Sequence, residues 1–391
     1  MDRILQNQES NRKEAILGIL LILLLLGVGL TTLYSASYDK ALRLGLESNY
    51  FFRRQVLFAI LGIASAIVIY LVPFSFIRAM VPVLLLSSFT LMLLTSLTPL
   101  GETRLGATRW IRFGSLSFQP SELVKVSVIL YLSNYLSQRT RIIREFKVAT
   151  IAIGVIFFSA LLIILQRDYS TTMVFLFLSF SILLIGGVKI THLLYYLLLA
   201  GVPGVLFLIT EEYRLKRVIG FIFKDIDPSG INYQVNLSMD AIASGGFFGK
   251  GFGQGIYKLG KLPEVQSDFI FSSFAEEFGL FGVICIILVF FILAYLGYRG
   301  AARHRESDHF LYLTGFGITH ILIWQVLLNL GVVSGIVPPT GIPLPFFSAG
   351  GTNLLMNLGM CGLLIKIISQ KEKVIEKNEE KTPQKRVIDF E

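Results

Sequence analysis

Long apolar runs alternate with short charged or Pro- and Gly-rich connections along most of this 391-residue chain. A helix needs about 20 consecutive apolar residues to cross the hydrocarbon core of a bilayer. About ten runs approach or exceed that length, so the pattern predicts an all-α polytopic membrane protein. The predicted spans are residues 15–35, 55–72, 78–98, 120–136, 148–166, 171–188, 191–210, 269–298, 310–336 and 350–368.

The spans define one membrane domain, residues 15–368, between an amino-terminal tail (1–14) and a carboxyl-terminal tail (369–391). The first span is too long for a cleaved signal peptide and predicts a retained helix. Arg and Lys crowd the connections after the fourth and eighth spans, which places these connections and both tails in the cytoplasm. The last tail is charged and nearly free of apolar residues, so we expect it to be disordered.

This orientation puts one long loop, residues 211–268, on the extracytoplasmic side. Its many glycines, such as Gly249 and Gly253, lack the strand–helix context of a dinucleotide site and indicate close backbone packing or hinge-like turns. The net charge of +9 is explained by cytoplasmic loops that face anionic lipid, not by a nucleic-acid partner. Cys285 and Cys361 lie far apart in apolar runs, and no metal-spaced His/Cys cluster occurs.

Asp268 is the strongest candidate for chemistry, because it directly precedes the apolar run that begins at Phe269. This position puts a carboxylate at the boundary between membrane and water, where it can meet both a lipid-borne substrate and water. Glu264 precedes it by four residues, and Arg214 and Arg217 lie in the same long loop. The alternative is an acidic residue that only flanks a membrane helix.

Two further charged pairs lie inside or beside apolar runs. Glu276 and Glu277 point about 100° apart on a helix, so at least one must face the protein interior or a water-filled cavity. Glu122 and Lys125, three residues apart, share one helix face. For both pairs, an internal structural ion pair and a substrate contact stay open. Residues 338–345 hold four prolines, which excludes a helix and predicts either a groove wall or a rigid connector.

Together these segments resemble the SEDS family (shape, elongation, division and sporulation), which includes FtsW, RodA and SpoVE. The resemblance extends from the first span to about Leu364. Its motifs are Arg109-Trp110-Ile111, Gln119 to Lys125, Gln166 with Asp168, Asp227-Pro228, Gly230, Tyr233-Gln234, Leu262-Pro263-Glu264, Asp268 to Phe271, Ala275-Glu276-Glu277 with Gly279, and Gly341 to Phe346. The chain departs from the pattern at Gln266-Ser267, usually His-Thr, at Ala349, usually Tyr, and at Arg167, commonly Pro.

The resemblance implies a peptidoglycan glycosyltransferase that polymerises lipid II, a lipid-linked disaccharide, at the outer face of the cytoplasmic membrane. Asp268 would be the catalytic base, and cations would balance the charge of the pyrophosphate leaving group. The residues expected to contact substrate are Arg109, Glu122, Lys125, Arg214, Arg217, Glu264, Glu276 and Glu277. No cofactor is expected, although a divalent cation could assist the reaction. The missing His before Asp268 puts in doubt any mechanism that needs an adjacent imidazole.

A lipid II transporter and a non-enzymatic scaffold for a transpeptidase are the alternatives. An aspartate at the outer boundary favours the enzyme, since a carrier would place its key charges near the midplane. Residues 329–333 and 253–264 favour the division-type FtsW, and residues 275–279 favour the elongation-type RodA. We expect the division type, at the septum with divisome proteins.

The family resemblance also implies a partner, a class B penicillin-binding protein with a single membrane helix. Gly315 and Gly317 lie on the ninth span, where small residues permit close approach of a partner helix or, alternatively, packing within the chain itself. The sequence thus predicts that the partner helix docks on the eighth and ninth spans, near these glycines.

Overall fold

The computed structural model describes residues 2–104, 107–114, 116–209 and 232–370. Ten long helices correspond to the ten predicted spans. They are α1 (Asp2–Arg43), α2 (Tyr50–Leu71), α3 (Phe74–Leu97), α4 (Pro120–Ser137), α5 (Phe146–Leu165), α6 (Tyr169–Ile185), α7 (Ile190–Ile209), α10 (Ile270–Ala302), α11 (His309–Val333) and α12 (Gly351–Ser369). The protein is therefore a multi-pass membrane protein, as the hydrophobic pattern predicts.

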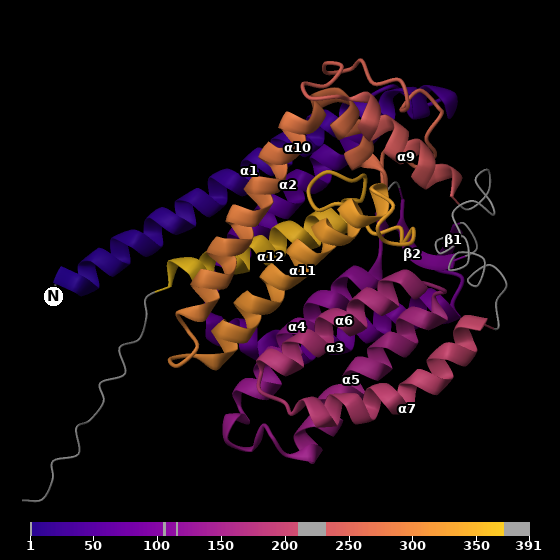
Figure 1. Cartoon of the computed structure of the whole chain (residues 1–391). Coiled ribbons are helices and arrows are strands. Elements are labelled where there is room, and N and C mark those ends of the chain that lie inside the picture. The colour runs from indigo at the N-terminus through magenta and orange to yellow at the C-terminus, as the bar shows by residue number, and fades with distance from the viewer. Residues whose placement is uncertain (1, 105–106, 115, 210–231, 371–391) are drawn as a thin grey trace, which may run out of the picture.

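The helices pack in two adjoining groups (Figure 1). In one group α2 lies along α12, and α1 and α11 pack against α10. In the other group α4 packs against α3 and α6, and α5 contacts α6 and α7. Large apolar side chains such as Leu86 and Leu198 remain exposed on the outside of the bundle, which is the arrangement expected of surfaces in contact with lipid tails.

A small antiparallel sheet joins α3 to α4, and the sequence pattern did not predict it. Its strands, β1 (Gly101–Arg104), β2 (Ala107–Phe113) and β3 (Leu116–Phe118), are ordered β1-β2-β3. Along β2, Ala107 and Ile111 are buried whereas Arg112 is exposed, so its two faces alternate as in an ordinary strand. Gly114, with φ of +60°, supplies the left-handed turn before β3. Because β3 ends at Phe118 and α4 begins at Pro120, the sheet positions the start of α4.

The predicted extracytoplasmic loop contains an additional helix, α9 (Tyr233–Ser244), followed by turns that lead to α10. Arg214 and Arg217 lie outside the described residues, as do the Asp227-Pro228 motif and Gly230. The predicted disordered tail from Lys371 also lies outside them.

Gly315 and Gly317 are buried inside the helix bundle, not on its surface. A Cβ atom at Gly315 would lie 2.9 Å from the Cβ of Ala301 in α10, and one at Gly317 would lie 2.7 Å from Cγ2 of Ile129 in α4. Both glycines therefore allow α11 to pack closely against its own neighbours. The prediction that they form a docking surface for a partner helix is wrong.

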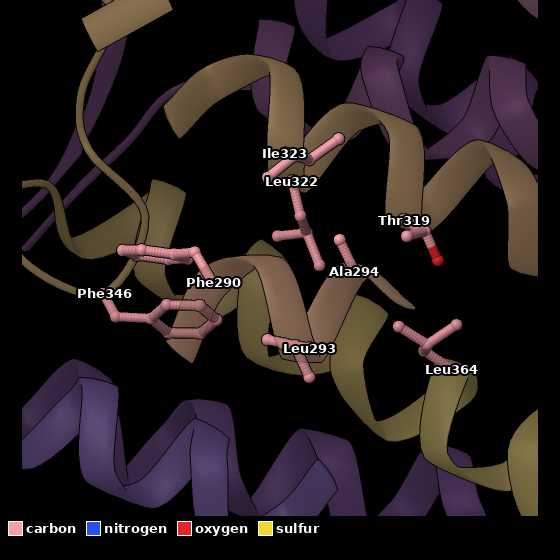
Figure 2. A pocket seen from close by; sticks show the side chains of 8 residues that line it. All are labelled: Phe290, Leu293, Ala294, Thr319, Leu322, Ile323, Phe346 and Leu364. Atoms are coloured by element: carbon pink, nitrogen blue, oxygen red, sulfur yellow. The ribbon is translucent and has the colours of Figure 1, made fainter. Parts of the chain in front are cut away.

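A small apolar pocket lies between α10, α11 and α12 beside Phe346 (Figure 2). Phe290, Leu293, Leu322 and Leu364 contribute to its wall, and Thr319 is its one polar residue. The Thr319 hydroxyl already donates to the carbonyl of Gly315 at 2.8 Å. The pocket therefore offers apolar contact only, and the candidate chemistry lies elsewhere.

Candidate active site

Asp268 is half-buried in the last turns before α10. Three successive carbonyl oxygens of this segment accept hydrogen bonds: Gln266 O from Ala349 N at 2.8 Å, Ser267 O from Ser348 Oγ at 2.6 Å, and Asp268 O from Asn329 Nδ2 at 2.8 Å. The donors belong to α11 and to the Pro-rich connection before α12. These bonds fix the backbone that carries the Asp268 carboxylate.

The Pro-rich connection also passes directly beside that carboxylate. Gly341 has φ of +67°, and a Cβ atom there would lie 3.2 Å from Oδ2 of Asp268. Asn329 Nδ2 donates a second hydrogen bond to the carbonyl of Ile342 at 2.9 Å, so one amide joins this connection to the Asp268 segment. Phe346 and Phe347 are buried and anchor the connection in the bundle. Of the two predicted roles, this arrangement fits a wall beside the candidate base.

Gln55 of α2 joins the same assembly. It is buried, its Nε2 donates to the carbonyl of Ser348 at 2.9 Å, and its Oε1 accepts from Gly350 N at 3.3 Å. Sequence reasoning missed Gln55, Asn329 and Ser348 as parts of the site. For Gln55 and Asn329 the available signal was an amide within or beside an apolar run, where an unpaired polar group is costly.

Glu264 links the Asp268 segment to the end of α1. Its Oε1 accepts from Lys40 Nζ at 2.8 Å, and its Oε2 accepts from Gln266 Nε2 at 2.9 Å. The backbone of Glu264 has φ of +53°, a left-handed conformation that is uncommon for a residue with a side chain. Its side chain remains 42% exposed, so substrate contact stays a prediction for this residue.

Glu276 and Glu277 are both buried, and each has a lysine partner. Glu276 accepts from Lys250 Nζ at 2.7 Å and from Ile256 N at 2.8 Å. Glu277 accepts from Lys258 Nζ at 2.5 Å and from Ser35 Oγ of α1 at 2.7 Å. These contacts favour the structural alternative, in which the two glutamates hold residues 245–260, the glycine-rich segment, onto α10 and α1. Direct contact with substrate stays a prediction for them.

The glycine-rich segment approaches α10 at a break in that helix. Gly279 has φ of +65° and ψ of −171°, a conformation essentially restricted to glycine. A Cβ atom at Gly279 would lie 2.2 Å from the backbone nitrogen of Gly249. Beyond the break, Leu280 N donates to the carbonyl of Gly246 at 2.9 Å, so the segment supplies an acceptor for the helix. The predicted close backbone packing is confirmed for Gly249, whereas Gly253, with φ of +81° and no neighbour within 4 Å of a Cβ position, lies in an open turn.

Glu122 and Lys125 form an ion pair inside the bundle. The pair is separated by 2.8 Å, and each side chain is only 7% exposed. Asn353 Nδ2 of α12 donates to Glu122 Oε2 at 3.1 Å, and Asn357 Nδ2 donates to Asn353 Oδ1 at 2.8 Å. Pro120 starts α4, as predicted. The predicted pairing is present, and its burial leaves open whether it also faces substrate.

Arg109 lies on β2, against the turn between α5 and α6. Its Nη2 donates to the carbonyl of Arg167 at 2.9 Å, and its Nε lies 3.4 Å from Oδ2 of Asp168. Asp168 in turn accepts from Thr171 N at 3.2 Å and caps α6. Arg167 has φ of +59°, which proline cannot adopt, so the departure from the family's Pro accompanies a different backbone turn. Arg109 is 35% exposed and lies on the central strand of the sheet.

Comparisons with known proteins identify the family of this chain. The FtsW/RodA/SpoVE family of cell cycle proteins matches residues 16–373. The chain belongs to this family. It is 36% identical over 353 residues to a probable peptidoglycan glycosyltransferase FtsW of Borreliella burgdorferi, covering 89% of this chain and 95% of that protein. It is 35% identical over 351 residues to stage V sporulation protein E of Bacillus subtilis, with coverage of 89% and 95%.

Solved structures place the chain in the same FtsW/RodA/SpoVE fold. A chain of a peptidoglycan synthase complex that coordinates polymerisation and crosslinking superposes with a TM-score of 0.75 at 26% identity. That match covers 91% of this chain and 98% of the other. RodA of Thermus thermophilus superposes with a TM-score of 0.66 at 24% identity and supports the fold alone. The family predicted from the motifs is thus confirmed.

Proposed function

We propose that this protein is a peptidoglycan glycosyltransferase that polymerises lipid II at the outer face of the cytoplasmic membrane. The observation that carries the proposal is Asp268, a half-buried carboxylate whose backbone is fixed by three successive hydrogen bonds. Several family relatives are named as probable peptidoglycan glycosyltransferases, which supports the same activity.

In the proposed reaction an acceptor sugar hydroxyl attacks the anomeric carbon of a lipid-linked donor. A new carbon–oxygen bond forms while the bond from the anomeric carbon to the diphosphate breaks. Asp268 takes the hydroxyl proton, and the electron pair of the broken bond leaves on the diphosphate. A positioned general base of this kind contributes about 10²–10⁴-fold to the rate.

The remaining substrate contacts belong to the proposal in two groups. Arg109, Lys125, Arg214 and Arg217 would offset the charge of the diphosphate, and Glu122, Glu264, Glu276 and Glu277 would orient sugars or support the cations. Within the described residues, His, Cys, Asp and Glu do not gather in groups of three or more.

Polymerisation by the purified protein tests this function. In liposomes that contain fluorescent lipid II, we expect long glycan products without any other polymerase present. Movement of lipid II between leaflets with no polymer formed would overturn the proposal in favour of the transporter. Stimulation of an added transpeptidase, with neither polymer nor movement, would support the scaffold.

The proposal includes a place in the cell. The basic connections at Arg139–Lys147 and Arg299–Arg305 would face the cytoplasm together with both termini. Because several relatives are named FtsW, we favour a role in septal division over side-wall elongation. A tagged copy is expected in bands at midcell, and patches along the side wall would indicate the elongation role.

A class B penicillin-binding protein remains the proposed partner, docked on α10 and not at the buried glycines of α11. The outward face of α10 presents large apolar side chains, among them Phe281, Ile284 and Leu288, which are 57%, 46% and 54% exposed. No charged residue interrupts α10 between Glu277 and Arg299. Such a face suits a single apolar helix of a partner.

Bulky changes on this face should weaken the partnership. Replacing Ile284 and Leu288 together with tryptophan is expected to lower co-purification of the transpeptidase by about tenfold, because misfit side chains hold the helices apart. The control is Leu198→Trp, on the exposed side of α7. Undiminished co-purification of a stably folded Ile284→Trp/Leu288→Trp variant would remove α10 as the docking face.

Asn329 should act as a positioning residue. In the Asn329→Ala variant the carbonyls of Asp268 and Ile342 both lose their donor. Small displacements of a catalytic group can cost about 10²-fold, so we expect kcat for polymerisation to fall about 10- to 100-fold with KM nearly unchanged. Asn134→Ala on α4, where the amide contacts only Gln138, is the control. A fall in thermal stability with kcat intact would leave Asn329 a structural role only.

A further inference from the structure

Arg54 of α2 is a half-buried cation that the activity described above does not yet use. Its Nη2 donates to Ser117 Oγ at 2.5 Å. No carboxylate of the described residues lies within ion-pair distance of it. Its other N–H groups are not among the buried polar atoms that lack a hydrogen-bond partner. Solvent or a ligand can therefore reach them. Arg54 thus brings a full positive charge to this part of the molecule.

The side chain lies where the sheet and two helices meet. Ser117 is on β3, two residues before Gln119, whose N–H donates to Thr352 Oγ1 at 3.1 Å. The Thr352 hydroxyl donates back to the carbonyl of Ser117 at 3.2 Å. These bonds hold the amino-terminal ends of α4 and α12 beside each other, and neither helix has a side-chain cap. Both ends add positive potential near Arg54.

The first turn of α4, four residues after Ser117, contains a buried hydroxyl. Ser121, in the first turn of α4, is fully buried, and its Oγ makes no hydrogen bond within the described part of the chain. A buried polar atom of this kind ordinarily has a partner in the protein, in water or in a ligand. Its position in that turn is consistent with an anion that approaches the start of α4.

The junction is connected to the Asp268 segment by a short chain of hydrogen bonds. Gln55, the next residue after Arg54, donates to the carbonyl of Ser348 at 2.9 Å. The hydroxyl of Ser348 donates to the carbonyl of Ser267 at 2.6 Å. The residue after Arg54 is therefore linked through Ser348 to the segment that carries Asp268.

Two of the cations named earlier, Lys125 and Arg109, already face carboxylates of the described residues. Lys125 is buried and already neutralised by Glu122 at 2.8 Å, and Arg109 lies 3.4 Å from the carboxylate of Asp168. An arginine without a carboxylate partner keeps its charge, and its planar guanidinium can bind phosphate oxygens through two parallel hydrogen bonds.

We propose that Arg54 binds the diphosphate of the lipid-linked donor and stabilises it as it leaves. This inference rests on the proposed glycosyltransferase function and adds a substrate-binding residue to it. When the anomeric carbon–oxygen bond breaks, the electron pair stays on the diphosphate, whose negative charge rises by one. The Arg54 guanidinium faces that charge, while Asp268 receives the proton of the attacking hydroxyl.

Two substitutions test the inference, with the adjacent arginine as a matched control. Arg54→Ala is expected to lower kcat/KM for lipid II polymerisation about 100-fold or more. Arg54→Lys should restore part of kcat/KM, because lysine keeps the positive charge but cannot donate two parallel hydrogen bonds. Arg53→Ala should match the wild type, because Arg53 is exposed and pairs only with Glu47 at 2.7 Å. Thermal unfolding of each purified variant checks that the fold is kept.

Direct binding separates this inference from the function on which it rests. The probes are a polyprenyl diphosphate and the corresponding polyprenyl monophosphate in detergent. We expect Arg54→Ala to weaken diphosphate binding at least tenfold and monophosphate binding less. A wild type that polymerises lipid II, with a folded Arg54→Ala variant that binds the diphosphate normally, would overturn the role of Arg54 and leave the function standing. A wild type that makes no polymer would refute the function, and the binding comparison would still decide whether Arg54 recognises diphosphate.

Discussion

Replacing Asp268 by asparagine is expected to lower the rate of glycan polymerisation by about 10²–10⁴-fold, the usual contribution of a general base. Asparagine has the same shape, and the segment keeps its backbone bonds to Asn329 and Ser348. The asparagine amide, unlike the carboxylate, cannot accept the proton of the attacking hydroxyl. The loss should therefore appear in kcat, with binding of lipid II and the thermal unfolding midpoint close to those of the wild type.

Asp240→Asn supplies the control for this measurement. Asp240 is an exposed aspartate on α9, in the same long loop that is predicted to be extracytoplasmic. Its substitution changes the net charge by the same amount without touching the Asp268 segment. Polymerisation at the wild-type rate by a folded Asp268→Asn protein would remove Asp268 from the chemistry and with it the mechanism proposed here.

The second large effect is expected from the buried Glu122–Lys125 pair. In Lys125→Met, Glu122 loses its cation while it remains only 7% exposed. Breaking a buried ion pair on one side typically costs about 3–5 kcal/mol, because the remaining charge is uncompensated. We expect a large fall in the thermal unfolding midpoint in detergent. The exposed pair of Lys13 and Glu9 is the control, and its removal should leave the unfolding midpoint nearly unchanged, because solvent screens an exposed pair.

A double variant distinguishes the two roles left open for this pair. Glu122→Gln together with Lys125→Met removes both charges, and replacing a whole buried pair is often nearly neutral for stability. We expect the double variant to regain most of the lost stability. If it is stable but does not polymerise lipid II, the pair contacts substrate; if it is stable and active, the pair is structural. Unchanged stability of Lys125→Met alone would contradict the burial argument.

The helices could be predicted from the sequence because a bilayer imposes their length and apolar character. The predicted fifth span, residues 148–166, differs from α5 (Phe146–Leu165) by no more than two residues at either end. The sheet and α9 were missed because neither meets that constraint. The alternation of Ala107 to Phe113 was a signal for a strand, but it is short and lies next to residues with no apolar pattern.

At the site, the sequence located Asp268 but could not supply its surroundings. The hydrogen bond from Ser348 to Ser267 joins residues 81 positions apart, and that from Asn329 to Asp268 joins residues 61 apart. Contacts of this range depend on how the helices pack, which no local pattern encodes. Gly315 failed as a docking residue for a related reason, since a small residue permits close approach equally well to a neighbouring helix of the same chain.

Helix α1 sets a dimension for the whole protein. Its 42 residues span about 63 Å at about 1.5 Å per residue, roughly twice the thickness of a bilayer's hydrocarbon core. Near one end Glu14 pairs with Arg299 and Arg303 of α10, and near the other Lys40 and Arg43 bind Glu264 and the carbonyl of Leu259. The single helix α1 therefore connects the ion pairs near its amino-terminal end to the contacts near its carboxyl-terminal end. Helix α1 thus fixes the distance between the Glu14 ion pairs and the loop that leads to Asp268, whatever the thickness of the surrounding lipid.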